Sequence, residues 1–206
     1  MKLKVCGITD FNQAKSLAQM SVDFIGFIGY EKSPRYAWNK ISPAEVATLK
    51  NVLKVGVFVN EKVDKVLELA HQAELDYIQL HGDEPLEVVK EIAKDFKVIK
   101  AISISNDLED LQSKINSMQN EVSYFLFDTA TPNYGGSGQK FDWHILNQLN
   151  ISKPFFLSGG IGLESRIDSS TFKTAPYALD INSRFEVEPG VKDLIMIKDF
   201  ILKNNI

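Results

Sequence analysis

The sequence predicts a compact (βα)8 barrel, or TIM barrel, formed by a single domain over residues 1–206. Short apolar runs rich in β-branched and aromatic residues alternate with longer amphipathic stretches from one end of the chain to the other. The apolar runs are continuous, which is typical of parallel strands that are buried on both faces. No low-complexity tract and no change of composition divides the chain.

Eight of the apolar runs are expected to be strands. In chain order they are Leu3–Cys6, Phe24–Tyr30, Leu53–Val59, Tyr77–Leu80, Val98–Ile102, Tyr124–Phe127, Phe155–Leu157 and Ala178–Ile181. Helical patterns lie at Phe11–Gln19, Pro43–Leu49, Lys62–Ala73, Pro85–Lys94, Leu108–Met118, Trp143–Leu149 and from Asp193 to about Lys203. Two helix starts are marked by capping residues, since Pro43 follows Ser42 and Asp107 precedes another helical pattern.

An eightfold alternation of strand and helix closes most economically as a barrel, although about 250 residues is the usual size. The alternative is a doubly wound open sheet, which usually has about five or six strands and a GxGxxG turn after the first. Here that turn reads Cys6-Gly7-Ile8-Thr9, without the glycine pattern. The barrel is therefore favoured.

The composition excludes several classes of protein. The formal net charge is −4, whereas a protein that binds nucleic acid or an anionic membrane needs a basic surface. The segment Met1–Val5 lacks the apolar stretch of a signal peptide, and no apolar run approaches the roughly 18 residues of a membrane span. We expect a cytoplasmic protein, monomeric, with a homodimer left open as the alternative.

Metal and disulfide chemistry are also not expected. Cys6 is the one cysteine, so neither an internal disulfide nor a cysteine-rich zinc site is available. No pair of the three histidines has the spacing of metal ligands. The sequence therefore predicts a site built from ordinary acid, base and hydrogen-bonding groups.

In a barrel of this kind the functional site lies at the carboxyl ends of the strands. Polar, small or ionisable residues follow the predicted strands there, and these are the candidate site residues: Cys6, Arg35, Gln79, His81, Asp128, Gly159, Gly160, Asp180, Asn182 and Ser183. We expect them to converge on one mouth of the barrel.

Several of these candidates have a structural alternative. Cys6 is either a small buried apolar residue or a thiolate base whose pKa is lowered by nearby positive charge. Asp128 ends an apolar strand and would be costly to bury without partners, yet it could cap a loop. Arg35 could clamp a carboxylate or phosphate, or be a solvated loop charge. His81 could be an acid–base group, or a histidine satisfied by neighbouring backbone.

Two features around these residues indicate a ligand. Ser158-Gly159-Gly160-Ile161-Gly162 and Asn182-Ser183 follow strands seven and eight, whose loops form the recurrent phosphate site of this fold. The segment from Thr129 to Lys140 is longer than the usual loop of about two to six residues, which indicates an active-site lid or, alternatively, a surface insertion.

The motifs, taken in order, resemble those of the phosphoribosylanthranilate isomerase family over essentially the whole chain. They are Lys4–Thr9 (KVCGIT), Lys32–Tyr36 (KSPRY), Val55–Asn60 (VGVFVN), Gln79–Gly82 (QLHG), Phe127–Thr129 (FDT), Tyr134–Gly138 (YGGSG), Leu157–Gly160 (LSGG) and Glu188–Asp193 (EPGVKD). The resemblance implies a catalytic (βα)8 barrel of tryptophan biosynthesis that uses neither metal nor cofactor.

The resemblance also implies a reaction and roles. The reaction is the Amadori rearrangement of N-(5-phosphoribosyl)anthranilate to 1-(carboxyphenylamino)-1-deoxyribulose 5-phosphate. By position, Cys6 is similar to the general base, Asp128 to the general acid and Arg35 to the residue that binds the anthranilate carboxylate. The loops at Gly159–Gly160 and Asn182–Ser183 are similar to the phosphate loops. Such a pair needs one pKa raised and the other lowered.

One departure and two rival interpretations remain. After strand eight the family usually has Ser-Gly-Val-Glu, whereas this chain has Ser183-Arg184-Phe185-Glu186, so Arg184 either adds its charge to the phosphate or points to solvent. The rivals are the related isomerase of histidine biosynthesis and a catalytically silent barrel that only binds a phosphorylated ligand. An aspartate ends strand one in the former, where this chain has Cys6, and a pure binder needs neither Cys6 nor Asp128.

Overall fold

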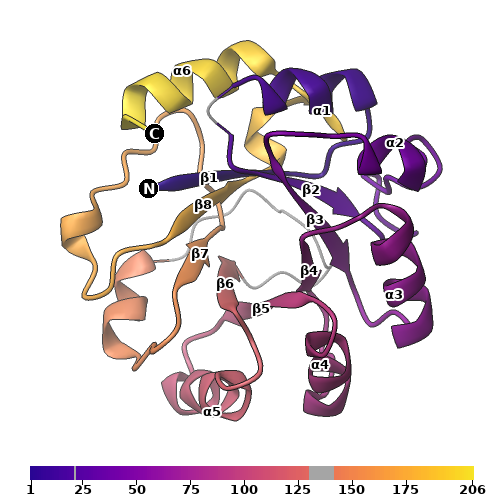
Figure 1. Cartoon of the computed structure of the whole chain (residues 1–206). Coiled ribbons are helices and arrows are strands. Elements are labelled where there is room, and N and C mark those ends of the chain that lie inside the picture. Colours follow the sequence, from indigo (N-terminus) through magenta and orange to yellow (C-terminus); the bar gives the residue numbers. More distant parts are fainter. Residues whose placement is uncertain (21, 130–141) are drawn as a thin grey trace.

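The computed structural model describes residues 1–20, 22–129 and 142–206. Eight parallel strands pair in sequence order, and the last pairs with the first, so that the sheet closes into a barrel (Figure 1). The strands are β1 (Lys2–Cys6), β2 (Phe24–Ile28), β3 (Leu53–Phe58), β4 (Tyr77–Leu80), β5 (Lys97–Ile104), β6 (Tyr124–Thr129), β7 (Phe155–Leu157) and β8 (Ala178–Ile181). The predicted fold class is confirmed.

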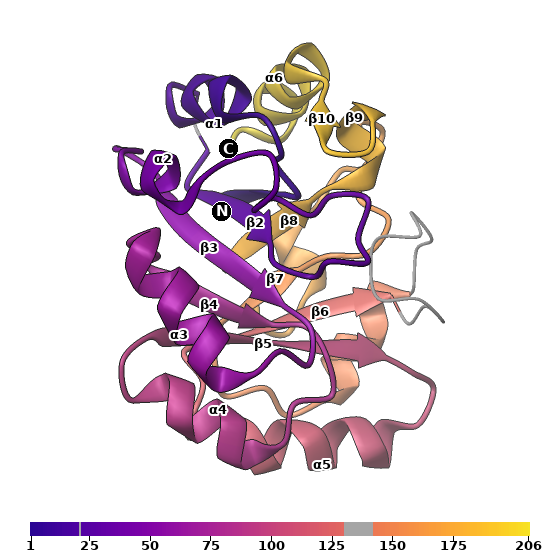
Figure 2. The same cartoon turned by 90° about the vertical axis from the view of Figure 1, so that its right-hand side faces the viewer.

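Helices surround the barrel as an outer layer (Figures 1 and 2). They are α1 (Phe11–Ala18), α2 (Pro43–Ala47), α3 (Val63–Gln72), α4 (Leu86–Ala93), α5 (Leu108–Met118) and α6 (Leu194–Asn204). The predicted helix starts are confirmed. Ser42 and Glu45 form a reciprocal capping box, and the Asp107 side chain accepts a hydrogen bond from the Asp110 backbone N–H.

The regular alternation of strand and α-helix is interrupted after β6 and after β7 in the part of the chain that the structure describes, which corrects the expectation of eight similar units. After β6 the described part of the chain forms only a 3₁₀ helix, η1 (Trp143–Gln148), and after β7 another, η2 (Ser169–Thr171). Ser, Thr, Asn and Asp side chains compete for backbone hydrogen bonds, as when the Asp168 side chain accepts the Ser170 N–H.

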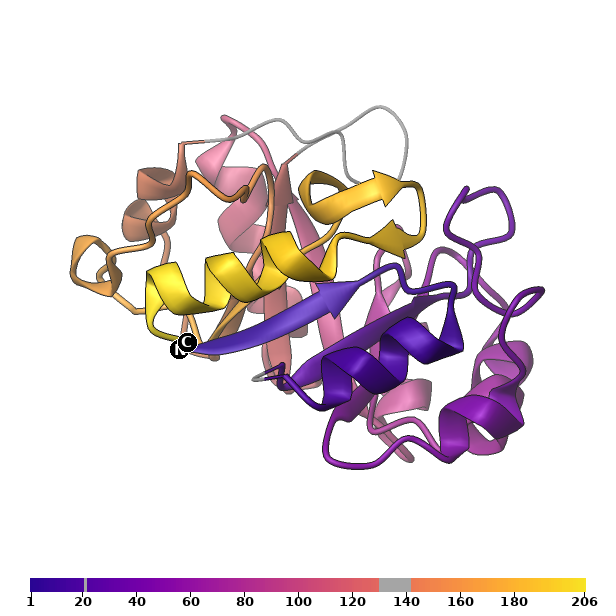
Figure 3. The same cartoon turned by 90° about the horizontal axis from the view of Figure 1, so that it is seen from above.

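A small hairpin follows β8. The 3₁₀ helix η3 (Ser183–Phe185) leads into β9 (Glu186–Glu188), which pairs antiparallel with β10 (Val191–Lys192). The Thr9 hydroxyl donates to the Gly190 carbonyl at 3.0 Å, and Gln13 exchanges hydrogen bonds with the Lys192 backbone at 2.9 and 2.8 Å. The hairpin is thereby fixed against the loop after β1 and the first turn of α1, beside the carboxyl end of β1 (Figure 3).

Two buried clusters hold the barrel together. The larger lies between the strands and the helices, and the smaller fills the barrel interior with side chains such as Phe24, Val55 and Leu126. At the amino-terminal end, aromatic rings of Tyr77 and Tyr124 meet edge to face with centroids 5.9 Å apart. This packing closes one end of the barrel and leaves the other for a site. Among the described residues, no helix is long and apolar enough to span a membrane.

Candidate active site

Four predicted site residues share the inner face of the barrel. Cys6 belongs to the interior cluster with Tyr77, Leu126 and Ala178. Side chains two residues apart on a strand point to the same side, so the residues two positions further along β4, β6 and β8 also point inward. They are Gln79, Asp128 and Asp180. The structure thus brings these four together at the carboxyl end of the strands.

The Cys6 thiol lies in a buried, charged environment. Cys6 is only 4% exposed, and a Cβ on Gly26 of the neighbouring strand would be 2.7 Å from its Sγ. Beside it, the Lys4 ammonium donates to Asp180 at 3.0 Å, and both side chains of this ion pair are buried. Lys4 and Asp180 are directly paired across β1 and β8. A buried cation and a buried carboxylate therefore both act on the thiol.

The expected lowering of the Cys6 pKa is not what the structure shows. Burial raises the pKa of the thiol, and the Asp180 carboxylate raises it further, while the positive charges of Lys4 and Lys192 oppose this without overcoming it. Burial is the largest of these causes. Each cation near the thiol is also paired with a carboxylate. The thiol is protonated at neutral pH in the ligand-free protein.

Asp128 contacts a chain of polar groups from β4. Its Oδ1 accepts the Thr129 backbone N–H at 2.8 Å, and its Oδ2 lies 3.5 Å from Nε2 of His81. The amide nitrogen of Gln79 lies 2.9 Å from Nδ1 of His81. Because that nitrogen only donates, Nδ1 accepts, and the ring proton is on Nε2, directed to Asp128. His81 is held by side chains, not by backbone alone.

Gln79 retains an unused acceptor. Its Oε1 is buried and has no hydrogen-bond partner among the described residues. An unsatisfied buried acceptor is costly, so this atom is suited to receive a hydroxyl of a bound ligand. The observation supports the prediction that Gln79 contacts a ligand.

Arg35 is fixed by a carboxylate that the sequence did not single out. Its Nε donates to Oε1 and Oε2 of Glu186 at 2.9 and 3.0 Å, and its Nη2 donates to Oε2 at 2.7 Å. The Arg35 side chain is 13% exposed, so the alternative of a solvated loop charge is wrong. A Cβ on Gly7, which has φ of +77°, would be 2.8 Å from Cδ of Arg35, so glycine is required for the arginine to lie over this turn.

The predicted phosphate loops contain two glycines with positive φ. Gly159 and Gly160 adopt φ of +85° and +69°, and Asn182 follows β8 with φ of −148° and ψ of −101°. Ser183 begins η3. Arg184, the departure from the family pattern, forms an ion pair with Glu164 at 3.1 Å, and both side chains are exposed. Its guanidinium is thus held by a surface carboxylate in this structure.

Three residues of the mouth were missed as site residues by sequence reasoning. Lys4 could have been found, because a lysine inside the apolar run Leu3–Cys6 shares the inward face with Cys6. Glu186 and Lys192 could not, because only the folding of the hairpin brings them to Arg35. The predicted lid, Thr129 to Lys140, lies outside the described residues except for Thr129.

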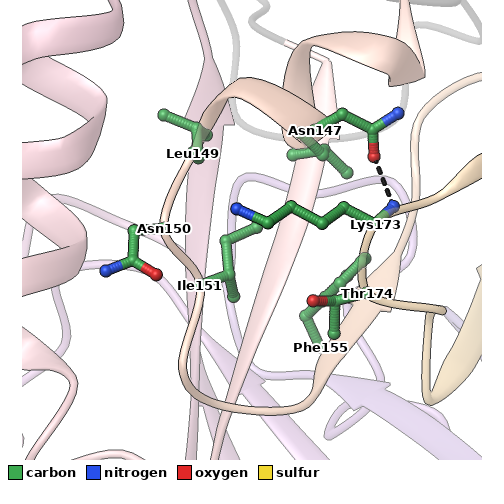
Figure 4. Close-up of a pocket in the computed structure, with 8 residues that line it drawn as sticks. Asn147, Leu149, Asn150, Ile151, Phe155, Lys173 and Thr174 are labelled. Carbon is green, nitrogen blue, oxygen red and sulfur yellow. Dashed lines mark hydrogen bonds between the residues drawn. The ribbon is translucent and has the colours of Figure 1, made fainter.

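A separate small cavity lies away from the mouth, between η1 and the segment that follows η2 (Figure 4). Asn147, on η1, accepts the Lys173 backbone N–H at 2.7 Å at its edge. The cavity has a volume of about 30 Å³, which is enough for little more than a water molecule. In the described segments no group of three or more His, Cys, Asp or Glu side chains is arranged to hold a metal ion.

A (βα)8 barrel that gathers a buried thiol, a carboxylate and an arginine at one mouth has the groups that an acid–base enzyme for a small anionic ligand needs. Residues 3–203 match the model of the N-(5'phosphoribosyl)anthranilate (PRA) isomerase family. The chain belongs to this family and is therefore an isomerase of tryptophan biosynthesis. This result favours neither the histidine-biosynthesis isomerase nor the catalytically silent barrel.

Individual relatives agree with this assignment. The N-(5'-phosphoribosyl)anthranilate isomerase of Parabacteroides distasonis is 40% identical over 98% of this chain and 92% of its own. The crystal structure of the Thermotoga maritima phosphoribosyl anthranilate isomerase covers the whole chain and 98% of its own, with 37% identity and a TM-score of 0.83. A phosphoribosyl anthranilate isomerase in complex with reduced 1-(o-carboxyphenylamino)-1-deoxyribulose 5-phosphate covers 98% and 96%, with 34% identity and a TM-score of 0.77.

Proposed function

We propose that the chain converts N-(5'-phosphoribosyl)anthranilate to 1-(o-carboxyphenylamino)-1-deoxyribulose 5-phosphate, with Cys6 as the general base and Asp128 as the general acid. The observation that carries the proposal is the convergence of these two side chains on the inner face of the same barrel mouth. A protein that only bound the phosphosugar would need neither group. The matching family supports the choice of substrate.

The first step is the opening of the ribose ring. Asp128, as the general acid, delivers a proton to the furanose oxygen as the bond from that oxygen to C1 breaks. The nitrogen lone pair forms the C1–N double bond, which gives an iminium ion. The His81 Nε2–H, 3.5 Å from Asp128 Oδ2, stabilises the carboxylate that remains.

The second step is proton transfer from C2. The iminium ion makes the C2 proton acidic, and Cys6, which has released its own proton to solvent, removes it as the thiolate, so that an enolamine forms. The enolamine then takes up a proton at C1 and loses the proton of its C2 hydroxyl, which gives the ketone. The cationic iminium also adds positive charge beside a thiol that Lys4 and Lys192 already stabilise in its ionised form. Thiolate formation is therefore favoured once the ring has opened.

The two ends of the substrate are anions, and each has a counterpart in the mouth. Arg35 binds the anthranilate carboxylate, and the backbone around Gly159, Gly160, Asn182 and Ser183 binds the phosphate. Gln79 Oε1 accepts a ribose hydroxyl. The ligand in the complexed relative carries both a carboxyl and a phosphate group, which supports a site with two anion seats.

Kinetics of Cys6→Ala and Asp128→Asn test the assignment. Each variant is expected to lose about 10²–10⁴-fold in kcat, because each lacks one proton-transfer group. The affinity for the reduced product analogue is expected to stay close to that of the unchanged protein. Asp168→Asn is the matched control, since Asp168 only caps η2 at the surface. Near-normal turnover by Cys6→Ala or Asp128→Asn would contradict that residue's role.

The remaining expectations form part of the same proposal. Residues 1–206 act as one catalytic domain in the cytoplasm. The proposed reaction needs neither a disulfide nor a membrane. The active form is a monomer, and sedimentation at the concentration of the assay distinguishes it from a homodimer.

A further inference from the structure

The carboxylate of Glu186 connects three basic or donor groups of the mouth. Its Oε1 accepts the Lys192 Nζ at 2.6 Å and the Gly190 backbone N–H at 3.1 Å, in addition to Nε of Arg35. Lys192 in turn donates from Nζ to Oδ1 of Asn182 at 2.7 Å. One buried carboxylate therefore links the proposed carboxylate-binding arginine to the loop after β8.

The geometry of the Arg35 pair leaves one edge of the guanidinium available. Glu186 takes the edge formed by Nε and Nη2. The opposite edge is formed by Nη1 and the second hydrogen of Nη2. Its two N–H donors are spaced to match the two oxygens of a carboxylate. Nη1 makes no hydrogen bond to any residue that the structure describes. The guanidinium is thus held from one side and can receive a second carboxylate on the other.

The charge of the cluster fits an incoming anion. Arg35 and Lys192 each carry a positive charge, and Glu186 carries the only negative charge of the three. Burial alone would raise the pKa of Glu186, but the hydrogen bonds from Arg35 and the charge of Lys192 outweigh it and lower the pKa. The Glu186 and Lys192 side chains are 4% and 0% exposed, so this charge pattern is part of the folded core.

We propose that Glu186 is a positioning residue that aims the free edge of Arg35 at the carboxylate of the substrate and so determines its specificity for an anthranilate derivative. The inference rests on the proposed function, because it takes Arg35 as the carboxylate-binding group. Glu186 does not touch the reacting atoms. It acts through Arg35, which without it has other rotamers open to its long side chain.

The test compares two substrates, phosphoribosylanthranilate and the analogue made from aniline, which lacks the carboxylate. The quantity measured is the ratio of kcat/KM for the natural substrate to kcat/KM for the analogue. Glu186→Gln is expected to lower this ratio by about tenfold. Glu186→Asp keeps the charge beside Lys192 but is one methylene shorter, so it is expected to lose the same discrimination while folding normally. Asp23→Asn, which removes a paired carboxylate at the other end of the barrel, is expected to leave the ratio unchanged.

Each outcome is decisive. A structural role for Glu186 would lower kcat/KM for both substrates equally, and that result would overturn the proposal. Adding Glu186→Gln to Arg35→Met is expected to change the ratio no further, since the two residues act as one unit. If Arg35→Met alone preserved the ratio, the assignment of Arg35 would fail, and the positioning role with it. An inactive unchanged protein would instead refute the proposed reaction.

Discussion

At Cys6, burial and positive charge act in opposite directions on the same thiol. Burial disfavours the thiolate, whereas Lys4 and Lys192 favour it. Both lysines are themselves paired with buried carboxylates. In the proposed mechanism, ring opening adds the positive charge of the iminium ion beside this thiol. If Cys6 is the base, the protein thereby avoids the cost of a permanently buried thiolate.

The raised pKa of Cys6 predicts the pH dependence of the isolated protein. The thiolate is the reactive form, and its fraction increases as the pH rises toward a pKa above the ordinary value of about 8.5. We expect kcat/KM to increase from neutral pH and to continue rising beyond pH ~8.5 in a stopped-flow assay. Lys4→Met should displace this rise to still higher pH. A profile that levels off below pH ~7 would show that the free thiol has a lowered pKa.

At the residue scale, the sequence could predict the side chains that stand at strand ends but not their partners. Cys6 ends an apolar run, Asp128 follows one and Asp180 lies near the end of another, so their position in the barrel was predictable. The pairing of Arg35 with Glu186 joins residues 151 positions apart. Local pattern carries no signal for such a contact. The sequence also left the direction of the Cys6 pKa shift open between its two alternatives, because the shift depends on burial and on charges that only the folded structure brings to the thiol.

At the scale of elements, the loop after β4 is built around a second buried ion pair. Lys100 on β5 donates to Glu84 at 2.9 Å and to the Gly82 carbonyl at 2.6 Å. Glu84 also accepts the backbone N–H groups of Asn60 and Gly82. This pair ties the ends of β3, β4 and β5 together. The loop that carries His81 toward Asp128 is therefore fixed by Glu84.

Removal of this carboxylate is expected to destabilise the fold. Glu84→Gln leaves Lys100 buried without a counter-charge, so the free energy of unfolding in urea should fall by about 3–5 kcal/mol. Glu91→Gln breaks an exposed pair with Lys94 on α4 and should cost about 1 kcal/mol or less. Equal losses in the two variants would show that the buried pair has no special role in the loop.

Elements with clear periodicity and caps were predicted well, and those with weak signals were not. The segments α2 and α5 begin where Ser42 and Asp107 indicate. The segment Trp143–Leu149 has a helical pattern, but Trp143–Gln148 forms a 3₁₀ helix, in which Leu146 is the buried residue. A short segment that buries so little gains too little from packing to complete an α-helix. The residues of the hairpin β9–β10 show no strand pattern in the sequence. The hairpin depends on contacts with Thr9 and Gln13, which are distant in the chain.

At the scale of the whole molecule, the barrel has one closed end and one polar end. Aromatic rings close the amino-terminal end, while the ionisable side chains gather at the carboxyl ends of the strands. A net charge of −4 is compatible with an anionic substrate because Arg35, Lys192 and backbone amides supply local positive potential. The fold class was predictable because continuous apolar runs repeat through the chain. The charge pairs of the mouth were not, because they form only when the barrel closes and brings distant residues together.

The most direct test of the account is the fluorescence of phosphoribosylanthranilate, generated in solution from anthranilate, after addition of the purified protein with a chelator present. We expect the fluorescence to decay far faster than the spontaneous rate, and the acceleration to be lost in Cys6→Ala. No acceleration by the folded, unchanged protein would contradict the proposed reaction. Undiminished acceleration by Cys6→Ala would leave the reaction standing but would contradict the central claim that this thiol is the base.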